Sequence, residues 1–135
     1  MSTILMSIKP EYVKKIFAGE KKYEYRKIKC KNSPNKIIVY ASFPIKKIVG
    51  ELIIEEVLYD KKDVIWEKTN MYGGISQKKY DEYFKNKEHA VAYKIKEYIK
   101  YDPVRELKDY DVLSAPQSYI YINNRIDLEN EKVDN

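Results

Sequence analysis

The residues best suited to chemistry are Gly19, Lys21, Glu24 and Arg26, which follow the spacing G-x-K-x-x-E-x-R. Side chains alternate along a strand, so Glu24 and Arg26 are expected on the same face. A carboxylate and a guanidinium beside a lysine can bind polar, hydrogen-bonding or anionic ligands. The alternative is a structural Glu24–Arg26 ion pair on an exposed strand, which would contribute little.

A second candidate is the segment that contains Tyr72, Gly73, Gly74 and Ser76. Two glycines before a helix allow backbone amides to approach a ligand, and a helix start favours anions. The chain has four glycines, so two adjacent ones indicate a constrained backbone. The alternative is an ordinary loop with Ser76 as the N-cap of a helix.

Polar residues at two predicted strand ends complete the candidate ligand-binding set. Gln117 and Ser118 carry paired donors and acceptors where a strand begins, and they can contact a base edge. Their alternative role is to hold the loop backbone. Ser7 and Lys9 follow the first predicted strand and either reach the same cleft or only end the strand.

The elements that must position these residues follow from periodicity and turn residues. Pro10 suits the first position of a helix, and Gly19 suits its C-terminal end. Asp102-Pro103 is expected to end the fifth strand. The pattern indicates an α+β domain with a mixed sheet, whose third strand is central and buried. Strands are predicted over residues 4–8, 22–28, 36–42, 47–58, 90–101 and 118–122, and further helices over 60–69 and 76–85.

Length and composition exclude several classes of protein. A chain of 135 residues fits one domain. No apolar run reaches the roughly 20 residues of a membrane span, and no signal-peptide pattern stands at the N-terminus, so a cytoplasmic protein is expected. Cys30 and His89 are each the only residue of their type. A disulfide within the chain and a cysteine-based zinc site are therefore excluded, and no metal or cofactor is expected.

Positive charge is concentrated in the first third of the chain. Residues 1–50 hold 12 Lys and Arg against 3 Asp and Glu, whereas residues 51–135 hold 14 against 18. A basic face can bind phosphates by releasing counterions. The alternative is a lysine-rich surface that reflects composition alone. Besides Lys9, the candidate contacts to a nucleic-acid backbone are Lys14, Lys22, Lys27, Lys29 and Lys31.

These motifs resemble the ASCH domain family of the PUA-like superfamily. The G-x-K-x-x-E-x-R spacing carries the match, and three other stretches agree with small bacterial and phage members: ILMSIKP from Ile4, VGE from Val49 and APQSY from Ala115. The resemblance implies a PUA-like mixed β-barrel of five to six strands with two to three helices. It divides the chain into a domain over residues 1–122 and a polar tail over residues 123–135. It also implies that the motif residues line a cleft between the barrel and its helices.

The same resemblance leaves function classes open. The first is a binding module, with a regulatory role as one option, that recognises a base or modified nucleoside of RNA, with DNA as the alternative polymer. The second is an enzyme that uses Lys21 and Glu24, either a ribonuclease or an amidohydrolase that acts on acylated cytidine. Such amidohydrolases pair the lysine with a threonine and a glutamate, but Glu24 and Gly73-Gly74 stand at those places here. A protein-interaction domain is the third class, and the oligomeric state stays open.

Overall fold

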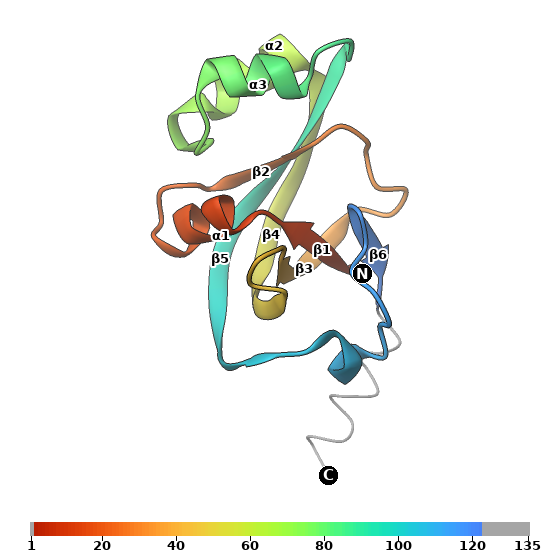
Figure 1. Cartoon of the computed structure of the whole chain (residues 1–135). Helices are drawn as coiled ribbons and strands as arrows, with labels where there is room; N and C mark the ends of the chain where they lie inside the picture. The colour runs from red at the N-terminus through yellow and green to blue at the C-terminus, as the bar shows by residue number, and fades with distance from the viewer. Residues whose placement is uncertain (1, 123–135) are drawn as a thin grey trace.

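The computed structural model describes residues 2–122, which form a mixed six-stranded sheet and three α-helices (Figure 1). This is the α+β architecture expected from the sequence, and it is consistent with a PUA-like fold. The predicted tail over residues 123–135 lies outside the described residues. In chain order the elements are β1 (Ser2–Ile8), α1 (Pro10–Phe17), β2 (Tyr23–Arg26), β3 (Pro34–Ala41), β4 (Lys47–Lys61), α2 (Lys62–Thr69), a 3₁₀ helix (Asn70–Tyr72), α3 (Gln77–Tyr83), β5 (His89–Arg105), a second 3₁₀ helix (Leu107–Tyr110) and β6 (Tyr119–Tyr121).

The strand order in the sheet is β2-β5-β4-β3-β1-β6. Strands β1 and β3 pair in parallel, with Ser7 opposite Tyr40, and the remaining pairs are antiparallel. Because parallel strands end at the same edge of a sheet, the residues after β1 and β3 lie together. The segment before β6 reaches the same edge, since β6 runs antiparallel to β1.

Three clusters of buried side chains form the core. The first lies between the sheet and α1, where Val13 and Ile16 pack against strand residues such as Ile37. The second lies on the other face of β1 and β3 and includes Tyr110. The third lies beneath α2 and α3. Strand β3 has neighbours on both sides and is buried over most of its length, as predicted.

Local sequence fixes both ends of α1. Pro10 occupies the first helical turn, where its missing N–H has no intrahelical acceptor to lose. Gly19 has φ +78°, and the amides of Gly19 and Glu20 donate to the carbonyls of Ile16 and Lys15. These two bonds are the Schellman pattern that ends a helix. The chain then reverses directly into Lys21 and β2.

The two longest strands carry the α2–α3 segment at one end of the molecule (Figure 1). Helix α3 begins after Ser76, whose hydroxyl accepts a hydrogen bond from the amide of Lys79 at 3.2 Å, so the predicted N-cap is confirmed. Tyr80 and Phe84 are buried and pack edge-on against Tyr25 of β2. This packing sets α3 beside the free edge of β2.

The prediction that Asp102-Pro103 ends the fifth strand is wrong, because β5 continues to Arg105. In the ladder, Gly50 pairs with Lys100 and Ile48 pairs with Arg105, so four residues of β5 face one residue of β4. Such an irregularity releases the intervening amides from the ladder, and a proline is tolerated there because it has no N–H to contribute. Strand β2 is also shorter than the predicted 22–28.

No helix among residues 2–122 has the length and apolar character that crossing a membrane requires.

Candidate functional site

Three charged side chains lie together at the edge of β2, two of them buried and Arg26 partly buried. Lys21 is 2% exposed and Glu24 is 5% exposed. Arg26 Nη2 lies 2.8 Å from Glu24 Oε2, and Lys21 Nζ lies 3.8 Å from Glu24 Oε1. The pair is therefore not the exposed structural pair that the sequence left as an alternative. Buried charges interact more strongly than exposed ones, and each must have a partner.

The ammonium group of Lys21 is held among aromatic rings and a carbonyl. It donates to the carbonyl of Gly73 at 2.6 Å and lies 5.2 Å and 4.8 Å from the ring centroids of Tyr12 and Tyr25. Burial lowers the pKa of Lys21; Glu24 opposes this change, whereas the nearby positive charges of Arg26 and Lys15 add to it. This lysine thus releases its proton more readily than a solvated one.

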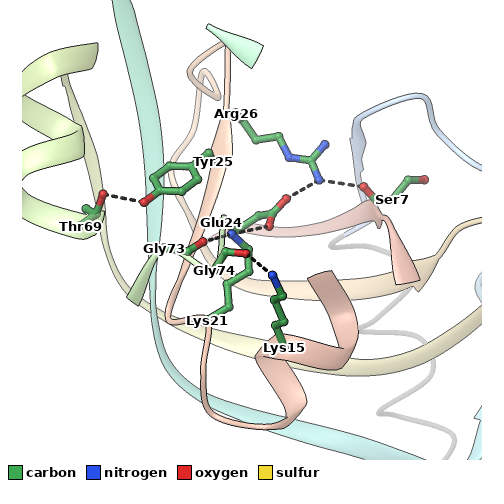
Figure 2. Close-up of polar contacts among 9 residues, drawn as sticks. All are labelled: Ser7, Lys15, Lys21, Glu24, Tyr25, Arg26, Thr69, Gly73 and Gly74. Atoms are coloured by element: carbon green, nitrogen blue, oxygen red, sulfur yellow. Dashed lines mark hydrogen bonds and ion pairs between the residues drawn. The ribbon is translucent and has the colours of Figure 1, made fainter. Parts of the chain in front are cut away.

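The Gly73-Gly74 loop meets cations with its carbonyl groups, contrary to the prediction that its amides face an anion. Lys15 Nζ donates to the Gly74 carbonyl at 2.8 Å, beside the bond from Lys21 to Gly73 (Figure 2). The expected backbone constraint is present: a Cβ at Gly73 would lie 2.3 Å from Tyr25 Oη, and Gly74 has φ +71°. Helix α3 has seven residues, too few to make its N-terminus an anion site. The loop therefore orients the lysines.

Arg26 connects the outer strand β2 to β1 and to the segment before β6. Its Nη2 donates to the Ser7 carbonyl at 2.8 Å as well as to Glu24 (Figure 2). Its Nη1 lies 3.4 Å from Ser118 Oγ. Its Nε is buried and has no hydrogen-bond partner within the described residues. The guanidinium is thus fixed in position by the contacts of its Nη1 and Nη2 groups.

A cavity of about 290 Å³ opens beside these charges. This volume is at the lower end of the range of about 300 to 1,000 Å³ for small-molecule sites. Its wall combines cations, tyrosines, hydroxyls and one carboxylate. We call this cavity the cleft, and its lining residues are Ser7, Lys9, Tyr12, Lys21, Glu24, Tyr25, Arg26, Ser42, Ile75, Lys79, Tyr83 and Gln117.

Six of the candidate ligand-binding residues line the cleft: Ser7, Lys9, Lys21, Glu24, Arg26 and Gln117. The other five do not line it, and four of them contact or cap elements that do. Gly73 and Gly74 orient Lys21 and Lys15, and Ser118 contacts Arg26. Ser76 caps α3, and the ring of Tyr72 lies 4.4 Å from Lys22 Nζ. Tyr72 therefore differs from the other four, since Lys22 does not line the cleft.

The sequence missed six residues of the lining: Tyr12, Tyr25, Ser42, Ile75, Lys79 and Tyr83. A signal existed for two of them, because Lys79 and Tyr83 are four residues apart and share a face of α3. Ile75 lies between two predicted residues. Tyr12 and Tyr25 carried no such signal, since their apolar spacing is equally typical of core residues.

The lysines that the sequence predicted to contact a nucleic-acid backbone are spread around β2. Lys27 Nζ lies 4.6 Å from the ring centroid of Tyr83, beside the cleft. Lys29 Nζ lies 5.3 Å from the ring of Tyr59. Lys22 covers Tyr72, and Lys14 and Lys31 are exposed.

Cys30 and His89 do not contribute to the cleft. The thiol of Cys30 is buried in the core, 2.8 Å from the Tyr93 hydroxyl. Within residues 2–122 there is no group of three or more His, Cys, Asp or Glu that could hold a metal ion.

Comparison with known proteins identifies relatives of this architecture. A family model described as "ASCH domain" matches residues 6–99. The large ribosomal subunit protein uL22 of Ureaplasma parvum is 31% identical over 121 residues, which are 89% of this chain but 39% of that protein. The chain thus spans about two fifths of the length of that relative.

A relative of similar size comes from Zymomonas mobilis. The protein named "ASCH domain-containing ribonuclease" is 25% identical over 122 residues, which are 87% of this chain and 82% of that protein. The crystal structure of ASCH from the same organism has a TM-score of 0.85, with 20% identity, and the match covers 96% of this chain and 94% of that one. At this identity the likeness establishes the shared fold. Because the family model covers more than half of the sequence, and the sheet, the helices and the G-x-K-x-x-E-x-R residues are in place, this chain belongs to the ASCH domain family.

Proposed function

We propose that this chain is an RNA-binding module that takes one nucleotide of a single strand into the cleft. The observation that carries this proposal is the buried Lys21–Glu24–Arg26 group beside a cavity that tyrosines also line. Sequence-specific proteins usually bind RNA in its single-stranded form, by stacking bases on aromatic side chains and hydrogen-bonding their edges. The cleft offers both kinds of contact within a volume suited to one nucleotide.

Each charged group has a part in this proposal. Glu24 Oε1 lies 3.8 Å from Lys21 Nζ, beyond hydrogen-bond distance, so it can accept a hydrogen bond from the exocyclic amine of a base. Arg26 is held by Glu24 and Ser7, and its Nη1, whose exposed contact with Ser118 Oγ is long at 3.4 Å, can donate to an acceptor on the ligand. A fixed guanidinium loses little further entropy on binding, which favours affinity.

Residues at the rim would contact the rest of the nucleotide. Tyr83 is 37% exposed, lines the cleft and offers a ring for a base to stack on. Lys9 and Lys79 are exposed lining residues, suited to a phosphate without forming part of the buried group. The remaining predicted lysines would contribute a non-specific attraction that weakens as salt increases.

A binding assay tests this proposal directly. We expect Arg26→Ala to weaken the affinity for a labelled single-stranded RNA by at least about fivefold, equivalent to about 1 kcal/mol, measured by fluorescence anisotropy. Arg26→Lys keeps the charge but loses the fork of donors, so we expect a smaller loss of affinity.

Lys108→Ala is the matched control, because it also removes one positive charge but from an exposed position on the second 3₁₀ helix. Circular dichroism establishes that each variant is folded. Equal affinities for the Arg26→Ala and Lys108→Ala variants would refute the cleft as the binding site.

RNA cleavage is a second candidate function, favoured by the lowered pKa of Lys21. A lysine in its neutral form can accept a proton from a ribose 2′-hydroxyl, whose oxygen then bonds to the adjacent phosphorus while the bond from phosphorus to the 5′ oxygen breaks; the departing 5′ oxygen takes a proton from water. The Zymomonas mobilis relative is named a ribonuclease, which supports RNA cleavage as a candidate activity. We expect wild-type protein to cleave end-labelled RNA, Lys21→Ala to lose this activity, and a 2′-deoxy linkage to resist it. Cleavage by Lys21→Ala at the wild-type rate would contradict this second candidate.

The acetylcytidine hydrolysis considered from the sequence has less support. At the place of the glutamate in that pattern, this chain offers the carbonyl of Gly73, which already accepts a hydrogen bond from Lys21. Release of acetate from acetylated cytidine, abolished by Lys21→Ala, is the result that would favour it over RNA binding alone.

A further inference from the structure

A pair of stacked rings lies on the surface where β4 ends and β5 begins. The rings of Tyr59 and His89 are 5.2 Å apart between centroids, with an interplanar angle of 15°. The ladder pairs His89 with Lys61 and Tyr59 with Val91, so the two rings are diagonal neighbours on adjacent strands. Tyr59 is 47% exposed.

Core packing does not account for this stack. Neither Tyr59 nor His89 belongs to any of the three buried clusters or to the residues packed against them. Within the third cluster the rings are tilted or edge-on instead, at 80° between Tyr25 and Tyr80 and at 42° between Trp66 and Tyr80. A near-parallel, half-exposed stack presents a flat π-face, the surface on which single-stranded bases stack.

Two lysines link this stack to the cleft. Lys27 lies over Tyr83, which lines the cleft, and Lys29 lies over Tyr59. Only Ile28 separates the two lysines, and it is 71% exposed. Two residues span at most about 7 Å, so a single short segment brings one ammonium group to each ring. Cations beside exposed aromatic rings are the combination that follows a single nucleic-acid strand.

We infer that Tyr59 and His89 form a second base-stacking subsite for single-stranded RNA, connected to the cleft by phosphate contacts with Lys27 and Lys29. This subsite rests on the proposed function, because it would bind a further base of the same RNA strand whose first nucleotide occupies the cleft. It predicts that the affinity depends on the length of the RNA. A mononucleotide fills the cleft alone, whereas an oligonucleotide also covers Tyr59.

The test compares two ligands on the same variants. The probes are a nucleoside 5′-monophosphate and a labelled single-stranded RNA of about eight nucleotides, within the usual site size of single-strand-binding folds. We expect Tyr59→Ala to weaken the affinity for the oligonucleotide by at least about fivefold, because one stacked base contributes about 1 to 3 kcal/mol. Its affinity for the mononucleotide should stay within about twofold of wild type, a change below about 0.4 kcal/mol.

Three further variants sharpen the result. Tyr59→Phe retains the ring and should bind the oligonucleotide as wild type does. Lys29→Ala should weaken oligonucleotide binding and reduce its salt dependence. Tyr98→Ala is the matched control, because Tyr98 is 39% exposed on β5 and packs against Phe17, remote from this path.

The outcomes separate this subsite from the cleft. Unchanged oligonucleotide affinity in Tyr59→Ala overturns the subsite while leaving the cleft proposal standing. Equal losses for both ligands also overturn it, because Tyr59 would then act through the fold or the cleft. If the wild-type protein binds neither ligand, the proposed function fails, and the subsite fails with it.

Discussion

Two ion pairs on neighbouring strands of one sheet have the same distance between nitrogen and oxygen, but they differ in how far their side chains are exposed to solvent. Arg26 and Glu24 meet at 2.8 Å with side chains 14% and 6% exposed, and Lys94 and Glu55 meet at 2.8 Å with side chains 36% and 47% exposed. The first pair lies at a cavity, and the second lies on the outer surface of β4 and β5. Distance alone therefore does not distinguish a candidate site from a solvated pair; burial and the convergence of other groups do.

The pKa values of the lysines in these two regions shift in opposite directions. The hydrogen bond that Lys94 donates to Glu55 raises the pKa of Lys94, whereas burial lowers the pKa of Lys21 although Glu24 lies close to it. An exposed lysine keeps its hydration and gains a partner, so its charged form is favoured. A buried lysine loses hydration, and the loss outweighs the gain from one carboxylate.

The largest expected contrast is in stability. Glu24→Ala leaves the buried ammonium of Lys21 and the guanidinium of Arg26 without their shared carboxylate, so we expect a loss of about 3 kcal/mol in the free energy of unfolding. Glu55→Ala removes only a solvated partner and should leave the urea midpoint close to wild type. Similar midpoints for the two variants would show that the buried group is not under the electrostatic constraint we describe.

A smaller contrast separates two glycines with positive φ. A Cβ added at Gly19 (φ +78°) would have no atom within 4 Å, whereas a Cβ at Gly74 (φ +71°) would lie 2.7 Å from Lys21 Cβ. We expect Gly19→Ala to cost about 1 kcal/mol through the backbone alone, and Gly74→Ala to cost about 1 kcal/mol more. Urea unfolding measures both. RNA affinity should fall only in Gly74→Ala, because that change displaces Lys21; equal effects on binding would contradict this reasoning.

The smallest expected effect is a difference in proton release. In an NMR titration of labelled lysine side chains, Lys21 should lose its proton at a lower pH than Lys94. Between its folded pKa and its higher unfolded pKa, Lys21 is protonated mainly in the unfolded chain, so its contribution to stability rises with pH in that window. Lys94 has the opposite sign: its contribution is present below its unfolded pKa and declines as pH rises through the folded value. Titration of Lys21 at or above Lys94 would contradict the effect of burial.

The elements whose ends depend on local chemistry could be predicted from the sequence. Pro10 and Gly19 act through their own backbone conformation, and the hydroxyl of Ser76 accepts a hydrogen bond from an amide only three residues later. The two ends of α1 and the start of α3 were therefore predicted correctly. Strand β5 continues beyond Pro103 because of an irregular pairing with β4, and nothing near Pro103 in the sequence encodes that pairing.

The site was predicted in part for the same reason. Glu24 and Arg26 share a face because a strand alternates, a local property. The orientation of the Gly73-Gly74 loop depends on where α3 packs against Tyr25, a contact between residues far apart in the sequence. The sequence therefore did not show that this loop turns its carbonyl groups toward Lys15 and Lys21. For the same reason, Tyr12 and Tyr83 could not be assigned to the cleft.

The buried charges at the edge of β2 are proposed to bind one nucleotide of RNA, and the second subsite at Tyr59 and His89 depends on that binding. The most direct measurement is an NMR titration of the labelled protein with each of the four ribonucleoside 5′-monophosphates. We predict shifts concentrated in the amides of Glu24, Arg26 and Tyr83 and in the side chain of Lys21. Shifts confined to another surface, such as that around Lys94 and Glu55, or no shifts with any nucleotide, would contradict it.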